Sequence, residues 1–184
     1  MKSKIQIDAE GVLLFGLMLF SLSWREMEAL VTAAVAHEAG HVLAFCCAGM
    51  PPTGIRFTLS GPVLICREPE SKLHAVIVVL AGPVAGIILS GCLYHIWRLC
   101  AEISFLLSIV NLIPVLPLDG GRLLRLMTPA NTEVWLQIAG FLFSAVWMLA
   151  GLCLFYHGKN GFGILLFGVW LLILSCQEQQ FDVK

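Results

Sequence analysis

The chain has 184 residues, of which 59% are hydrophobic and 12% are charged, and its mean hydropathy is +0.90. A water-soluble domain of this length could not bury so much apolar surface, so the composition favours a polytopic membrane protein that exposes it to lipid. The net charge of −1, without any basic stripe, argues against a nucleic-acid partner.

Six apolar segments follow one another along the chain, and each is a candidate membrane-spanning helix. They are Ile5–Trp24, Met27–Ala48, Leu73–Trp97, Ala101–Leu118, Val134–Tyr156 and Phe162–Cys176. About 20 residues cross a bilayer as a helix, so the first, fourth and sixth segments are short or marginal. The expected fold is an all-α polytopic membrane protein with about six transmembrane helices, and its first span is expected to stay uncleaved.

Positive charges set the expected orientation. If the amino terminus is cytoplasmic, six spans place eight of the 11 lysine and arginine residues on the cytoplasmic side and leave Arg25, Arg98 and Lys159 on the other. Cytoplasmic loops of membrane proteins carry an excess of these residues. Both termini are therefore predicted to be cytoplasmic, in a bacterial-type cell membrane.

One sizeable polar connection, Gly49–Lys72, separates the second and third segments. It contains two short β-prone runs, Ile55–Leu59 and Val63–Cys66, on either side of a Ser-Gly-Pro sequence. Such runs around a turn sequence predict a β-hairpin. The hairpin could bind an extended peptide by strand addition, or it is a plain surface connection.

The sequence His37-Glu38-Ala39-Gly40-His41 lies inside the second apolar segment. Ionisable side chains at membrane depth are costly and by default mark a functional site. Two histidines four residues apart share one helix face and can bind one Zn²⁺, and the glutamate between them is placed to act as a general base. The alternative is a buried, hydrogen-bonded histidine pair without a metal, which the adjacent Glu38 makes the weaker interpretation.

A third metal ligand is expected elsewhere in the chain, because a catalytic zinc site usually has three protein ligands and a water. Asp119 is the candidate, at the end of an apolar segment broken by Pro114 and Pro117 and before two glycines. Irregular backbone at membrane depth is tolerated only inside protein or beside a wet cavity. The alternative is an aspartate that forms a turn or an N-cap at the start of the next helix.

Together these motifs resemble those of the site-2 proteases, which are intramembrane zinc metalloproteases. That family combines a His-Glu-x-x-His helix with a later Leu-Asp-Gly motif, here His37–His41 and Leu118–Gly120. The run Ala81–Gly86 is similar to the family's Ala-Gly-Pro-x-Ala-Asn motif. The resemblance covers about residues 29–125, and the run Asn111–Gly121 is especially similar to the sporulation branch of the family.

The resemblance implies that His37, His41 and Asp119 hold one Zn²⁺ per chain, and that Glu38 is the catalytic residue that activates water. It also implies that Asn111 hydrogen-bonds substrate near the scissile carbonyl. The implied activity is that of a metalloendopeptidase that cleaves a membrane-associated regulatory protein, such as a sporulation pro-sigma factor. An anti-sigma factor or another single-span regulator is the second choice of substrate, and membrane regulatory proteins and the lipid bilayer are the other implied partners.

The chain departs from the family pattern at two places. Gly86 stands where the middle motif has asparagine, so no polar role is expected at this position. The sporulation protease carries a cytosolic nucleotide-sensing domain at its carboxyl end, whereas this sequence ends at Lys184. We therefore expect a single membrane metalloprotease domain over residues 1–184, with its core at about 29–125 and no soluble regulatory domain.

The remaining distinctive residues favour packing roles. The seven cysteines form no Cys-x-x-Cys pair, and most lie in apolar runs, where free cysteine behaves as a small hydrophobe. Gly82 and Gly86 are predicted to form a small-xxx-small packing face rather than a site.

Two other functions remain open on the sequence. Transporters also place histidines and carboxylates at the bilayer midplane, so the chain could be a non-catalytic membrane metal carrier. It could also be a degenerate protease that only binds membrane partners. A carrier would keep its function in a Glu38→Gln variant, whereas a protease would lose it.

Overall fold

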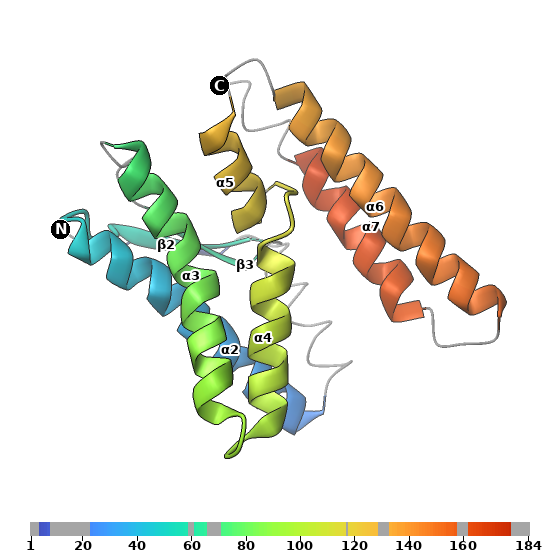
Figure 1. Cartoon of the computed structure of the whole chain (residues 1–184), viewed down its shortest axis with the longest axis horizontal. Helices are drawn as coiled ribbons and strands as arrows, with labels where there is room; N and C mark the ends of the chain where they lie inside the picture. The colour runs from blue at the N-terminus through green and yellow to red at the C-terminus, as the bar shows by residue number, and fades with distance from the viewer. Residues whose placement is uncertain are drawn as a thin grey trace. The chain divides into compact units, whose positions relative to one another are not determined.

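The computed structural model describes residues 4–7, 23–58, 61–65, 71–116, 118–128, 133–157 and 162–177 (Figure 1). Six helices and three strands lie in these ranges. The helices are α2 (Trp24–Cys47), α3 (Lys72–Leu93), α4 (Arg98–Asn111), α5 (Asp119–Met127), α6 (Glu133–Tyr156) and α7 (Phe162–Gln177). The chain divides into two compact units, Met1–Leu112 and Ile113–Lys184.

The predicted hairpin is confirmed as two antiparallel strands, β2 (Gly54–Thr58) and β3 (Gly61–Ile65), in which Gly54 pairs with Ile65. A third strand, β1 (Lys4–Ile7), pairs in parallel with the other side of β2, so the sheet order is β1-β2-β3. Of the predicted Ser-Gly-Pro turn, Gly61 and Pro62 belong instead to β3, where they pair with Thr58 and Phe57, and residues 59 and 60 lie outside the described residues.

The structure corrects the start of the first apolar segment, which was predicted to begin a membrane span at Ile5. Residues Lys4–Ile7 form a β-strand. The reason is visible in the sequence Lys-Ile-Gln-Ile, where polar and apolar residues alternate with the period of two that is typical of a strand. The rest of this predicted span, up to residue 22, lies outside the described residues.

Helix α2 has well-defined ends. Ser23 and Glu26 form a capping box: the Ser23 hydroxyl accepts from the Glu26 N–H at 3.4 Å, and the Glu26 carboxylate accepts from the Ser23 N–H at 2.8 Å. At the other end Gly49 has φ +75°, and the Met50 N–H donates to the Phe45 carbonyl at 2.9 Å, as in a Schellman motif. These caps stop the helix before the polar connection and hold His37 and His41 on its last three turns.

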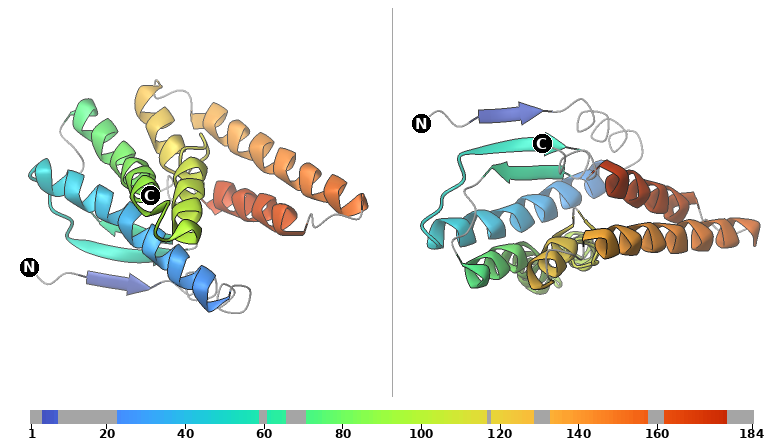
Figure 2. Two further views of the ribbon diagram at one scale, coloured as in Figure 1. Left: turned by 60° about the horizontal axis from the view of Figure 1, so that its bottom comes forward. Right: turned by 90° about the horizontal axis from the view of Figure 1, so that it is seen from above.

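In the first unit α2, α3 and α4 pack on one another through small residues. The backbone of Gly40 on α2 lies directly against Ala81 and Ala85 on α3, and a Cβ at Gly40 would clash with the Ala81 carbonyl. On α4, the Ser104 hydroxyl donates to the Gly86 carbonyl at 2.9 Å. Small residues and hydroxyls at helix crossings are typical of helices packed in a bilayer. Figure 2 shows the three strands along the side of α2 that faces away from α3.

In the second unit α6 and α7 form an antiparallel helix pair that is also joined through glycines. A Cβ at Gly151 would lie 2.5 Å from the backbone nitrogen of Leu165, and a Cβ at Gly168 would lie 2.7 Å from that of Met148. A small apolar core of Val115, Leu118 and Leu171 is fully or almost fully buried, with Trp147 and Phe167 packed against it. The irregular segment before α5 is thus fixed to α7.

In the part of the chain that the structure describes, three helices are long and apolar enough to cross a membrane: Trp24–Cys47, Lys72–Leu93 and Val134–Tyr156. They correspond to the second, third and fifth predicted spans. Many of their large apolar side chains are exposed, as expected for helices that face lipid. The fourth predicted span is a 14-residue helix followed by irregular backbone, and the sixth is a shorter apolar helix, so six spans are not confirmed among the described residues.

Candidate metal centre

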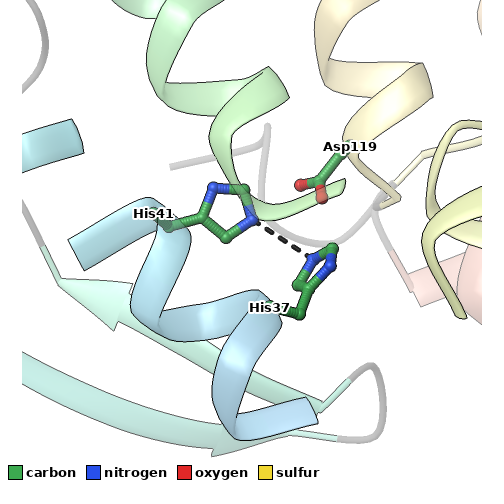
Figure 3. A group of neighbouring side chains, drawn as sticks. All are labelled: His37, His41 and Asp119. Atoms are coloured by element: carbon green, nitrogen blue, oxygen red, sulfur yellow. Dashed lines mark hydrogen bonds between the residues drawn. The ribbon is translucent and has the colours of Figure 1, made fainter. Parts of the chain in front are cut away.

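His37 and His41 lie on adjacent turns of α2, as their spacing predicts, and both are buried, with 5% and 7% of their surface exposed. Their Nε2 atoms are 3.3 Å apart (Figure 3). Two nitrogen ligands of a tetrahedral Zn²⁺, each about 2.0–2.1 Å from the ion, are separated by roughly 3.3–3.4 Å. The spacing of the two imidazoles therefore fits a shared zinc ion.

The orientation of His41 is set by a backbone group on α3. Its Nδ1 lies 2.8 Å from the carbonyl oxygen of Val78. A carbonyl can only accept, so Nδ1 carries the proton and donates it. The Nε2 atom of the neutral ring then presents its lone pair, which is the form that binds a metal. Sequence reasoning missed Val78, because no side-chain pattern marks a backbone carbonyl as a partner.

Asp119 is the first residue of α5 and is buried, with 5% of its surface exposed. The backbone before it is irregular, as the prolines predict: the Val115 N–H donates to the Ile113 carbonyl at 2.7 Å, and the Leu118 N–H donates to the Val115 carbonyl at 2.9 Å. Asp119 begins a nine-residue helix rather than a turn. A Cβ at Gly121 would lie 2.5 Å from the Val115 carbonyl carbon, so only glycine lets this helix start against that segment.

The side chains of His37, His41 and Asp119 each offer one ligand atom, and these atoms all lie within 4.8 Å of one another (Figure 3). Two imidazole nitrogens and one carboxylate oxygen are a donor set typical of catalytic zinc, which leaves a fourth position for water or substrate. The exposed Arg122 has its guanidinium 4.0 Å from the Asp119 carboxylate. The residues present thus fit a zinc ion.

The two predicted catalytic residues differ in their surroundings. Glu38 lies on α2 between the histidines and is half-buried. Asn111 is the last residue of α4, and its side-chain amide donates to the Leu107 carbonyl of the same helix at 2.9 Å. One N–H of this amide is therefore engaged with the helix. The roles of both residues remain predictions.

The class of fold follows from comparison with solved structures. The chain is similar to the site-2 protease from Methanocaldococcus jannaschii, with a TM-score of 0.63 over 95% of this chain and 89% of that chain. The two sequences are 20% identical, so this likeness shows the fold alone.

Two sequence comparisons indicate which protein family the chain resembles. Residues 90–155 match the model of peptidase family M50, a range that contains Asp119 but not the histidine pair. The chain is also 32% identical over 125 residues to “Putative zinc metalloprotease sll0528” from Synechocystis sp.. The aligned region covers 60% of this chain and 31% of that protein. The chain thus spans about a third of the length of this curated relative. Both matches support peptidase family M50.

Proposed function

We propose that this chain is an integral membrane zinc metalloendopeptidase that cleaves a membrane-associated regulatory protein. The group of three buried ligand side chains, His37, His41 and Asp119, within 4.8 Å of one another carries the proposal. Two of them lie on a helix long and apolar enough to cross a membrane. The match to peptidase family M50 and the name of the Synechocystis relative support the same chemistry.

Each site residue has one role in the proposal. His37, His41 and Asp119 hold one Zn²⁺, which when bound supplies a Lewis acid that makes water a usable nucleophile at neutral pH. Glu38 accepts the proton of the attacking water and passes it to the leaving amine of the cleaved peptide bond. Asn111 donates its second amide N–H to the substrate carbonyl as negative charge develops on the oxygen.

The substrate must present an extended backbone, because a helical segment hides its peptide bonds in its own hydrogen bonds. The sheet is a candidate for holding such a segment by strand addition. Strand β2 is paired on both sides, with β1 and β3. An added substrate strand would therefore pair with an outer edge of β3 or β1 rather than with β2.

The finer part of the proposal concerns the substrate and the orientation. The Asn111–Gly121 run resembles stage IV sporulation protein FB, which processes the precursor of a sporulation sigma factor, so a membrane-associated pro-sigma factor is the first candidate. An anti-sigma factor or another single-span regulator is the second. Both termini are proposed to be cytoplasmic, with the site accessible from that side.

A cleavage assay tests the proposal. The full chain is co-expressed with tagged membrane-associated pro-sigma and anti-sigma factors, and the purified pair is incubated in detergent with and without a zinc chelator. We expect a defined cleavage product that disappears with chelator and returns when zinc is added back. Zinc flux in reconstituted vesicles, with no cleavage of any candidate, would instead favour the membrane carrier.

A further inference from the structure

The motif Ala81–Gly86 on α3 is the one distinctive pattern to which the proposed function gives no task. Its second residue, Gly82, lies directly against the imidazole of His41: a Cβ at this position would overlap Nε2 and would lie 2.6 Å from Cε1 and 2.7 Å from Cδ2. The imidazole ring is rigid and cannot change its shape to relieve such a contact. The space that the His41 ring occupies is therefore the space left by the missing side chain of Gly82.

The carbonyl that accepts from His41 belongs to the same helix, one turn earlier. Val78 and Gly82 are four residues apart, so they share a face of α3. The ring of His41 thus rests on Gly82 while its Nδ1–H donates to the Val78 carbonyl at 2.8 Å. Both contacts are buried, and Val78 itself has 5% of its surface exposed. One helix provides both the space for the ring and the acceptor that orients it.

We propose that α3 is a positioning element for the metal centre, with Gly82 and the Val78 carbonyl holding His41 so that its Nε2 is directed towards the Nε2 of His37. The inference rests on the proposed function for the metal, but the contacts that His41 makes with Gly82 and the Val78 carbonyl involve residues of this chain alone. Gly82 and Val78 are positioning residues, because they act through His41. This proposal gives Gly82 a role beyond the helix packing that was predicted from the sequence.

The neighbouring glycines of α3 provide matched controls. A Cβ at Gly86 would overlap the hydroxyl of Ser108 on α4 and would not touch the His41 ring, whereas a Cβ at Gly91 would have no atom within 4 Å. The same glycine-to-alanine substitution can thus be made at three positions of one helix. The new Cβ meets the His41 imidazole in Gly82→Ala, a side chain of α4 in Gly86→Ala and open space in Gly91→Ala. The double variant Gly86→Ala with Ser108→Ala relieves the second clash.

The experiment measures Zn²⁺ affinity by competition with a chromophoric chelator on the purified full chain, together with the thermal unfolding temperature. Removing the partner of a metal-binding histidine typically lowers metal affinity by roughly 10- to 100-fold. We expect a loss of this size in Gly82→Ala and an unchanged affinity in Gly91→Ala. Gly86→Ala should lower the unfolding temperature with little change in affinity, and Ser108→Ala should restore that temperature.

A second readout does not depend on the metal. In chelator-treated protein with ¹⁵N-labelled histidine, NMR shifts should show His41 protonated on Nδ1 in the wild type and in Gly91→Ala. In Gly82→Ala, the Nε2-protonated form should appear. This readout keeps the inference testable if Gly82→Ala binds too little metal to titrate.

The outcomes separate this inference from the proposed function. Wild-type affinity and an unchanged His41 tautomer in Gly82→Ala would overturn the role of α3 and leave the protease proposal intact. A loss of affinity in Gly82→Ala that Gly86→Ala matches would also overturn it, because the effect would then come from helix packing in general. A wild-type chain that binds no zinc would instead contradict the proposed function. The tautomer measurement would still decide whether α3 positions His41.

Discussion

The Nε2 atoms of His37 and His41 lie 3.3 Å apart on adjacent turns of a helix whose neighbouring residues, apart from Glu38, are apolar. Two buried imidazoles whose ε nitrogens face each other at this distance repel through their lone pairs unless a proton or a cation lies between them. A neutral ring that donates from Nδ1, as His41 does to Val78, directs a lone pair towards its neighbour. The pair is therefore arranged to share a proton or a cation.

Replacement of either histidine should remove the zinc. We expect His37→Ala and His41→Ala to lower zinc affinity by more than the roughly 100-fold that loss of an outer partner costs at most, because a direct ligand is lost. Metal content after dialysis, measured by atomic emission, checks this. The control is His74→Ala: His74 is exposed at the start of α3, where its ring lies 2.9 Å from the Ser71 hydroxyl. Equal zinc content in all three variants would contradict the ligand set.

Replacement of Glu38 should separate metal binding from catalysis. In Glu38→Gln we expect full zinc content and a cleavage rate lower by roughly 10²- to 10⁴-fold, since the amide cannot accept the proton of water. Glu28→Gln is the matched control, because Glu28 is an exposed acidic residue of the same helix outside the motif. Cleavage at the wild-type rate in Glu38→Gln would rule out Glu38 as the base.

Asp119→Asn should distinguish a metal ligand from a helix-end charge. As a ligand, Asp119 is required for zinc affinity, and the variant should bind zinc far more weakly. As a charge that only complements the N-terminal dipole of α5, it would be worth about 0.3–1 kcal/mol of stability, and its loss would leave the metal in place. Zinc titration and chemical unfolding of the same sample decide between these. Arg122→Gln, which removes the neighbouring guanidinium 4.0 Å away, should leave zinc affinity unchanged.

Two buried serines of α4 should differ in their effect on stability. The Ser104 hydroxyl donates across to Gly86 on α3, whereas the Ser108 hydroxyl donates within α4 to the Ser104 carbonyl at 2.8 Å. Hydrogen bonds between membrane helices average about 0.6 kcal/mol. We therefore expect Ser104→Ala to lower the free energy of unfolding by about that amount and Ser108→Ala to lower it less, as measured by detergent-induced unfolding. A larger loss in Ser108→Ala would contradict the interhelical bond.

Patterns that depend on near neighbours in the chain could be predicted from the sequence. The second apolar segment was predicted as Met27–Ala48 and forms α2 at Trp24–Cys47, and the hairpin around Ser-Gly-Pro forms β2 and β3. The fifth and sixth segments match α6 and α7 to within one residue at each end, whereas the bounds of the first and fourth segments were predicted less well. The irregular backbone before Asp119 was expected from its prolines, but a helix at Asp119 was expected only in the alternative interpretation, because Asp-Gly-Gly is a turn sequence by itself. Burial of this segment against α7 overrides that local preference.

The sequence by itself determined which side chains could hold a metal, because a spacing of four residues on a helix places His37 and His41 on one face whatever surrounds them. It also determined that the chain carries helices suited to lipid, since hydropathy is a property of composition. Only the tertiary structure decided how His41 is held. The Val78 carbonyl and Gly82 belong to a helix some forty residues later in the chain. A backbone oxygen can accept from a distant histidine, and a glycine can leave room for its ring, only where the two helices pack together.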